Sequence, residues 1–224
     1  MDREKKQISD ALTSVKYISK TIAQHLYDMR DLHFDTFTDL LLHLSNDRVF
    51  NTRSIEILIR MGYFEEFGTT GKLLDVFNEF FNGEGRYSKT LVERSRMKRL
   101  EGLRRFEEAC LPRELPPQEQ VVFEGQYYGT PISTFDVKNL YYAMDVNTAY
   151  SPKIKLYSLR TGGVGTVKIR KPYFEETPFK PGDVIEVYSH RKAPAYAYVD
   201  GKRIKRPDIT ELWIDSYSVL PSMQ

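Results

Sequence analysis

The sequence contains very little cysteine and histidine, and this scarcity excludes several kinds of site. Its 224 residues include a single cysteine, Cys110, so an intramolecular disulfide is excluded. Four scattered histidines and one thiol do not form a cluster at the ligand spacing of a zinc site. We therefore predict neither a disulfide framework nor a metal site, and we expect Cys110 to behave as a small buried hydrophobic residue.

A long apolar run is also missing. The residues from Met1 to Lys6 are mostly charged and lead into an amphipathic pattern, whereas a signal peptide or a membrane span needs an apolar stretch. We therefore expect a cytoplasmic protein with no membrane partner, and a separate gene product that starts at Met1. Hydrophobic residues make up 41% of the chain and charged residues 29%, as in soluble proteins that build a core.

Catalytic patterns are missing as well. Two-metal phosphoryl transfer needs several carboxylates that converge on a rigid sheet, but the acidic residues of the N-terminal half are spaced like the polar face of a helix. No histidine stands beside a cysteine or serine in a motif for nucleophilic catalysis. We predict a protein that is not an enzyme and that needs no cofactor.

The N-terminal half has the periodicity of helices. Its apolar residues recur every three or four positions, as in the series Leu12, Val15, Ile18, Ile22 and Leu26. Residues 86–108 are predicted to form the last helix, and the prolines of residues 111–117 cannot continue it. The chain is therefore predicted to be α+β with two domains: an all-α domain at 1–110, a proline-containing linker segment at 111–136 and a β-domain at 137–224.

The most informative stretch of the helical half is residues 47–68. Asn51 or Thr52 is suited to cap a short amphipathic helix, and Gly62 and Gly68 are expected to end two short helices. This arrangement predicts a helical hairpin. Taken alone, the stretch fits any helical hairpin of a small domain equally well.

In the C-terminal half the pattern changes to the alternation of half-buried strands. The predicted strands are residues 153–159, 165–170, 183–188, a hairpin at 196–204 and 210–220. About five short strands of this kind predict a small five-stranded OB-fold β-barrel, a fold whose face binds single-stranded nucleic acid. An SH3-like barrel is the alternative that strand counting does not separate.

The order of these features resembles the C-terminal region of the bacterial C-family DNA polymerase III α subunit, in which tandem helix-hairpin-helix elements precede an OB-fold. That family has Asn-x-Arg, an apolar helix and x-x-Gly-x-Phe, as in residues 51–64 here. It also has Glu-Gln-Val-Val-x-Glu-Gly followed by an aromatic-rich turn, to which residues 119–125 and 127–132 correspond, with Thr130 in place of a histidine. The resemblance covers most of the chain and implies DNA binding in replication.

One departure from the family concerns its first hairpin, whose glycine amides hold a DNA phosphate. Ser19 and Thr21 stand where glycines are expected, and a side chain hinders close approach of the backbone to a phosphate. Duplex binding by the hairpin amides is therefore not implied, and the missing glycines also argue against a base-excision enzyme. Lys16 and Lys20 are candidate phosphate contacts, the alternative being a solvated helix face.

Positive charge is concentrated in residues 150–206, which hold 13 Lys and Arg against 5 Asp and Glu. Cations interleaved with aromatic rings suit a single-strand site, although tyrosine is also common in strands for packing reasons. The predicted binding residues of the barrel are Lys155, Tyr157, Arg160, Lys168, Arg170, Lys171, Tyr173, His190, Arg191 and Lys192. The last three are expected in a loop, as are Lys202, Arg203, Lys205 and Arg206. On the cationic helix 86–108 we select Arg96 and Arg99, which otherwise belong to a solvated face.

We therefore expect a non-catalytic DNA-binding accessory module of a replicative DNA polymerase. Its partners would be single-stranded DNA, with duplex DNA or RNA as further ligands, and a catalytic polymerase subunit acting in trans. Its location would be the nucleoid or the replication site of a phage or mobile element. The alternative is a protein-interaction module whose barrel binds a partner protein while the basic faces keep it soluble.

Overall fold

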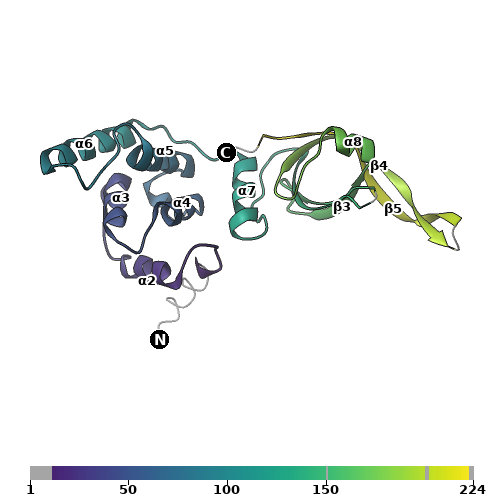
Figure 1. Cartoon of the computed structure of the whole chain (residues 1–224), viewed down its shortest axis with the longest axis horizontal. Coiled ribbons are helices and arrows are strands. Elements are labelled where there is room, and N and C mark those ends of the chain that lie inside the picture. Colours follow the sequence, from purple (N-terminus) through teal and green to yellow (C-terminus); the bar gives the residue numbers. More distant parts are fainter. Residues whose placement is uncertain (1–11, 150, 200–201, 222–224) are drawn as a thin grey trace. The chain divides into compact units, whose positions relative to one another are not determined.

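The computed structural model describes residues 12–149, 151–199 and 202–221 (Figure 1). The chain divides into two compact units, Met1–Leu115 and Pro116–Gln224. The first unit is helical, and its elements are α2 (Lys20–Asp28), α3 (Phe37–Asn46), α4 (Thr52–Arg60), the 3-10 helix η1 (Glu65–Phe67), α5 (Thr70–Asn82) and α6 (Glu93–Ala109). In its described residues, the second unit is a β-barrel with two helices.

The helical unit forms around the apolar positions that the periodicity indicates. Its fully buried side chains include Phe37, Leu41, Leu44, Ile55, Leu58, Ile59, Leu73 and Phe80. The short helices depend on their caps because each has few turns. Asn51 begins α4 with a capping box to Ser54, and Gly62 follows α4 with φ 74°, a left-handed conformation that suits glycine. The predicted cap and the predicted glycine stop are confirmed.

The last helix of this unit is shorter than predicted. It begins at Glu93 rather than near residue 86, because the preceding loop folds back onto α5. There the backbone N–H of Tyr87 donates to the carbonyl of Phe80, and the two rings stack with their centroids 5.4 Å apart. Packing of an aromatic ring on the core therefore replaces the first turns that local periodicity predicts for α6.

The segment predicted as a linker, residues 111–136, is divided between the two units. Arg113 belongs to the helical unit, where its guanidinium bonds to Asp75 and its backbone N–H donates to Thr69. Helix α7 (Pro117–Tyr127) belongs to the second unit, where its Val121 is buried against the barrel. Pro117 starts α7 because proline at the first helical position needs no amide partner. The prolines thus mark a short boundary between the two units near residues 114–116. Within the described residues 111–136, no long linker is present.

The second unit is a closed five-stranded barrel with strand order β1-β2-β3-β5-β4. Its strands are β1 (Leu140–Asn147), β2 (Lys153–Ser158), β3 (Val164–Ile169), β4 (Val184–Val199) and β5 (Lys202–Val219), and α8 (Lys171–Glu176) lies between β3 and β4. Neighbouring strands are antiparallel except β3 and β5, which are parallel. The core inside includes Ile154, Leu156, Val167, Ile169, Ile185 and Ile214.

Two expectations about the strands need correction. The sequence reading missed β1, whose residues alternate poorly because part of its outer face is also buried. It also separated β4 and β5 into shorter pieces, whereas their pairing continues from Ile185–Val219 to Val199–Lys202 through bulges at Ser189 and Pro194. Residues 200–201, expected as the turn of the hairpin at 196–204, lie outside the described residues. The arm of β4 and β5 extends away from the barrel body in Figure 1.

Candidate nucleic-acid interface

A row of side chains crosses the outer face of four adjacent strands of the barrel. Lys153 of β2 is the partner of Lys168 on β3, Lys168 is the partner of Trp213 on β5, and Trp213 is the partner of Arg191 on β4. The strand neighbours of these residues, including Ile154, Val167, Ile169 and Ile214, are buried in the core. Alternation therefore directs the row outward. We call Lys153, Lys168, Trp213 and Arg191 the cross-strand row.

A groove of about 450 Å³ adjoins the cross-strand row. Its lining includes Arg170, Lys171, Arg191, Pro194, Tyr196 and Trp213. Guanidinium and ammonium groups can neutralise phosphates, and the indole and phenol rings offer planes on which bases can stack. The groove therefore places both kinds of group within one concave surface.

Two cations of the row already have carboxylate partners. Lys168 Nζ lies 2.5 Å from Glu211 Oε1 and 5.5 Å from the centre of the Trp213 ring, and Arg191 Nη1 lies 2.5 Å from Asp215 Oδ1. Among the described residues, neither Lys153 nor Arg170 forms an ion pair. Lys153 and Arg170 can therefore attract a phosphate with their full charge, whereas the carboxylate partners of Lys168 and Arg191 offset part of the attraction of these two cations.

Helix α8 holds the other end of the groove in place. It carries Lys171 and Tyr173, and the guanidinium carbon of Arg170 lies 5.9 Å from the centre of the Tyr173 ring. The hydroxyl of Tyr217 donates to the carbonyl of Thr177, at the end of α8, over 2.7 Å. Burial raises the pKa of Tyr217 to about 12, so this hydroxyl remains a donor well above neutral pH.

The structure brings together five of the residues predicted for the barrel, namely Lys168, Arg170, Lys171, Tyr173 and Arg191. Lys155 is exposed on the same outer face of β2, as the alternation predicts, but it lies beyond the groove lining. Arg160 is exposed in the turn at the opposite end of β2 from Lys153. His190 and Lys192 are exposed within β4, so the loop expected for residues 190–192 is wrong. Lys205 and Arg206 likewise lie within β5, because the strand pairing continues past the barrel body.

Tyr157 is not available as a stacking residue. It does lie on the outer face, but α7 covers this part of the barrel, and the residue is only 5% exposed. Its ring packs in a cluster with Val121 and Leu159, and its hydroxyl donates to the carbonyl of Ser133 over 2.9 Å. Burial is the main cause that raises the pKa of Tyr157, with the charge of Glu124 as a further cause. We correct the prediction and assign Tyr157 to the packing of α7.

Sequence reasoning missed three residues of this surface: Lys153, Tyr196 and Trp213. Trp213 is the only tryptophan of the chain and stands between Leu212 and Ile214, which contribute to the barrel core. In the sequence, this apolar neighbourhood favours a core position for Trp213. The alternation of inward and outward residues along β5 could have indicated that Trp213 faces outward. Which residues of β5 face inward, however, depends on its pairing with β3 and β4.

In the helical unit, the hairpin before α2 differs from the predicted arrangement. The position with a left-handed backbone is Tyr17, at φ 72°, whereas glycine was expected at Ser19 and Thr21. Ser19 instead caps α2, and its hydroxyl accepts a hydrogen bond from the backbone N–H of Ile22 over 3.2 Å. One amide of the first turn is therefore already satisfied by a side chain, and Thr21 lies inside the helix.

Lys16 and Lys20 are both exposed on either side of this hairpin. Tyr17 is 57% exposed, and the guanidinium carbon of Arg53, from the first turn of α4, lies 3.5 Å from the centre of its ring. The cation of Arg53 is thus placed against the hairpin that carries Lys16 and Lys20. This is the part of the helical unit with the charge and exposure to contact phosphates.

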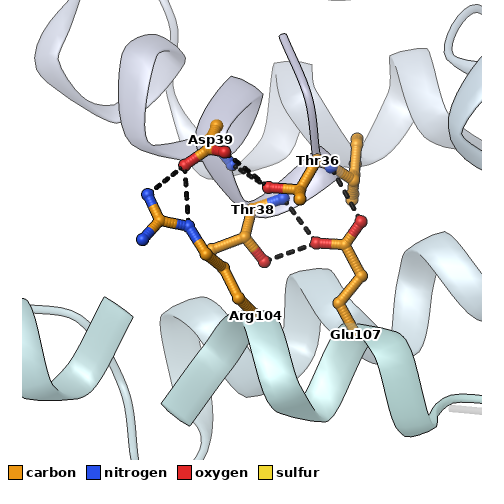
Figure 2. A network of polar contacts seen from close by, with 6 residues as sticks. Thr36, Thr38, Asp39, Arg104 and Glu107 are labelled. Carbon is orange, nitrogen blue, oxygen red and sulfur yellow. Dashed lines mark hydrogen bonds and ion pairs between the residues drawn. The ribbon is translucent and has the colours of Figure 1, made fainter. Parts of the chain in front are cut away.

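Helix α6 offers fewer free cations than its sequence indicates. Glu107 anchors it to the start of α3, and beside this contact Arg104 forms an ion pair with Asp39 (Figure 2). Arg96 is half-buried, and Arg99 is exposed with its guanidinium donating to the carbonyl of Glu84 over 3.4 Å. The cationic face predicted for this helix is therefore interrupted by contacts within the unit.

Within the described ranges, no group of three or more His, Cys, Asp and Glu side chains is placed to hold a metal ion. None of the helices described is long and apolar enough to cross a membrane.

Residues 1–74 match the family model of the helix-hairpin-helix motif. Comparisons with curated proteins and with solved structures give no significant match. The prediction of a helix-hairpin-helix element at the N-terminus is thereby confirmed. Because this motif is a DNA-binding element, the match supports a helix-hairpin-helix DNA-binding domain in the N-terminal part of the chain.

Proposed function

We propose that the protein is a non-catalytic, DNA-binding accessory module of a replicative DNA polymerase, and that its barrel is an OB-fold that holds single-stranded template DNA. The helix-hairpin-helix match supports DNA binding by the N-terminal unit. The strand order β1-β2-β3-β5-β4 and the position of α8 between β3 and β4 support the OB-fold assignment.

The observation that carries the single-strand site is the cross-strand row beside its basic groove. Single-strand sites combine cations that follow the phosphate backbone with aromatic rings that stack on bases. Lys153 and Arg170 provide positive charge that forms no ion pair among the described residues, and Trp213 provides a ring that lines the groove together with Arg170. A duplex would bury its bases away from the indole, so we expect single strands to bind more tightly.

The role beside a polymerase is supported by the resemblance of residues 119–132, which form most of α7 and the turn after it. The buried carboxylate of Glu124 accepts hydrogen bonds from the backbone N–H groups of Ile132 and Ser133, over 2.8 and 3.0 Å. It thereby fixes the turn that leads into the barrel. The partner we propose is a catalytic polymerase subunit acting in trans in the cytoplasm, at the nucleoid or at the replication site of a phage or mobile element.

Intrinsic fluorescence tests the barrel site directly because Trp213 is the only tryptophan. Titration with an oligothymidylate of about 15 nucleotides, within the usual range of site sizes, should quench the indole emission as thymine stacks on it. An equal length of duplex should quench less at the same concentration. A tight complex that leaves the emission unchanged would place the binding site elsewhere.

The polymerase role has its own test. Primer extension by a C-family catalytic polymerase subunit should become more processive when the purified protein is added, and Trp213→Ala should reduce that gain. The protein alone should show no nucleotide incorporation and no nuclease activity with Mg²⁺ or Mn²⁺. Incorporation or cleavage that persists through purification and is lost on mutation of a carboxylate of this chain would contradict the non-catalytic assignment.

A further inference from the structure

One strand of the barrel is only partly paired. β3 pairs with β5 over Val167–Leu212, Lys168–Trp213 and Ile169–Ile214, and this pairing ends there. Residues 164–166 pair with β2 on one side, but on the other side no strand among the described residues pairs with them. The barrel therefore has a short open edge at the start of β3.

The hydrogen-bond pattern identifies which backbone groups are open. Ser158 N donates to the carbonyl of Gly163 over 2.9 Å, and bonded pairs alternate with non-bonded pairs along an antiparallel ladder. The N–H and C=O groups of Val164 and Thr166 therefore point away from β2, toward the open side. Val164 is 51% exposed, and Thr166 is also exposed.

An apolar cavity of about 130 Å³ opens beside this edge. It is lined by Tyr141, Leu156, Gly163, Gly165, Val167, Val187, His190, Leu212 and Ile214. A Cβ atom added to Gly165 would have no neighbour within 4 Å, so the absent side chain of this glycine contributes to the space. Cavities of about 150 Å³ hold a benzene molecule, so the volume suits one aromatic or branched aliphatic side chain.

We propose that the open edge and the cavity bind an extended acidic peptide of a partner protein, which adds a strand to β3 and inserts one bulky apolar side chain. An added strand satisfies the N–H and C=O groups of Val164 and Thr166 with its own backbone. The apolar lining favours a hydrocarbon side chain over a nucleobase, because the polar edges of a base would lose hydrogen bonds there.

The charge next to the edge gives the peptide its acidic character. Lys155 lies on the outer face across β3 from the open side, as the cross-strand neighbour of Thr166, and Arg160 lies in the turn that joins β2 to β3. Both are exposed, and neither forms an ion pair within the described part of the chain. Glutamate or aspartate on the outward side of the added strand would complement these two cations. This proposal does not depend on the proposed single-strand site, since the cross-strand row contributes nothing to the cavity lining.

The test uses the full chain and a fluorescein-labelled peptide, Thr-Val-Glu-Phe-Glu-Val-Thr, measured by fluorescence anisotropy. Replacing its phenylalanine by glycine should weaken binding by about tenfold or more, the equivalent of one apolar side chain left unburied. In an added strand, alternate backbone N–H groups of the peptide point toward β3 and away from it. Methylating the nitrogens that point toward β3 should abolish binding, whereas methylating the others should leave binding nearly unchanged. Equal effects of both sets, or no binding of the peptide at millimolar concentration, would overturn the proposal.

Two variants of the protein test the same surface without disturbing the ladder. Gly165→Val fills the cavity, and its Cβ atom would have no neighbour within 4 Å. Thr166→Pro removes an edge N–H that makes no bond to β2, and Thr166→Ala is the matched control that keeps this N–H. We expect Gly165→Val and Thr166→Pro to lose peptide binding by about tenfold or more, while Thr166→Ala retains it.

Oligothymidylate binding to the same variants separates this proposal from the proposed function. Gly165→Val should leave quenching of Trp213 unchanged, and the oligonucleotide should not displace the peptide. Loss of oligonucleotide binding in Gly165→Val without any peptide binding would assign the cavity to a base instead. A concentration-dependent dimer that Gly165→Val dissociates would assign the edge to a second copy of this chain. Either result would overturn the peptide proposal.

Discussion

The carboxylate of Glu107 accepts hydrogen bonds from both the backbone N–H and the hydroxyl of Thr38, over 2.7 and 2.6 Å. Its other oxygen accepts from the backbone N–H of Phe37 over 2.8 Å (Figure 2). These amides belong to the first turn of α3, which has no partners for them within the helix. A residue of α6, far along the chain, therefore completes the start of α3 and joins the two helices.

Glu107→Gln should destabilise the helical unit, because the amide has one acceptor oxygen and turns an NH₂ group toward a backbone donor. Hydrogen bonds to a charged group contribute about 1.5–3 kcal/mol, and we expect a loss of that size in the free energy of unfolding. Urea unfolding followed by circular dichroism measures it. Thr38→Val, which removes one donor only, should cost about 1 kcal/mol.

The fluorescence of Trp213 provides an internal control for this measurement because it reports the barrel unit. The unfolding midpoint of the barrel unit should be the same in Glu107→Gln and Thr38→Val as in the wild type. An unchanged helical transition in Glu107→Gln would show that a charged acceptor is not needed at the start of α3.

The pair of Asp47 and His25 predicts a pH dependence of stability. A hydrogen bond from the backbone N–H of Val49 is the main cause that lowers the pKa of Asp47 below its ordinary 3.8; burial opposes this shift, and the contact with His25 adds to it. Since the folded pKa is depressed, the stabilisation is complete above pH 3.8 and is lost as the pH falls through the folded pKa.

The measurement compares the wild-type protein with Asp47→Asn in urea unfolding across this range. The difference in unfolding free energy should be constant above pH 3.8 and should shrink below it. His25→Asn should keep most of the acid-dependent loss, because the Val49 contact remains. A difference between the wild type and Asp47→Asn that does not change with pH would contradict the assignment.

The parts of this fold that could be predicted from the sequence are those fixed by neighbours along the chain. The cap at Asn51, the stop at Gly62 and the hairpin between β2 and β3 each depend on a few adjacent residues. The parts that could not be predicted depend on distant pairing. β1 is hidden because α7 covers part of its outer face, and the long arm of β4 and β5 requires pairing past Pro194.

The candidate site shows the same division at the level of single side chains. Alternation placed Lys168 and Arg170 opposite the buried Val167 and Ile169, as the structure has them. Alternation alone could not show that α7 buries Tyr157, nor that Trp213 lies between Lys168 and Arg191. The side of a strand is a local property, whereas exposure of that side depends on what packs over it.

Gly125 of α7 is predicted to be required for the packing of this helix on β1. A Cβ atom at this position would lie 2.0 Å from the hydroxyl oxygen of Tyr142 and 2.5 Å from its Cζ atom. The Tyr142 ring is buried and has little room to move, so Gly125→Ala should cost about 1–3 kcal/mol through overpacking. Urea unfolding followed by Trp213 fluorescence measures this cost.

The double variant Gly125→Ala/Tyr142→Leu checks the cause. If the clash with Tyr142 is responsible, the alanine should cost much less in the Tyr142→Leu background than in the wild type, because the two positions are in contact. Equal costs in both backgrounds would show that the glycine is needed for another reason.

Within the proposed single-strand site, Trp213 and Tyr157 should behave differently. Trp213→Ala should reduce oligothymidylate affinity by about 1–3 kcal/mol if a base stacks on the indole, and the effect should be similar at low and high salt. Tyr157→Phe should leave affinity unchanged, because this ring is buried and its hydroxyl bonds to Ser133. Anisotropy of a labelled oligonucleotide measures both variants. A Tyr157→Phe protein that folds normally but binds as weakly as Trp213→Ala would argue against the corrected assignment.

The ion pair between Lys168 and Glu211 should affect how the affinity for single strands depends on salt. For single strands the log–log slope of affinity against salt changes by about 0.7 for each phosphate neutralised. Arg170→Ala should reduce the slope by about that amount, whereas Lys168→Ala should reduce it less, because Glu211 already neutralises part of the lysine charge. Glu211→Gln releases Lys168 and should therefore steepen the slope and tighten binding at low salt. If Glu211→Gln folds normally and leaves both slope and affinity unchanged, the outer face of β3 does not contact the phosphates.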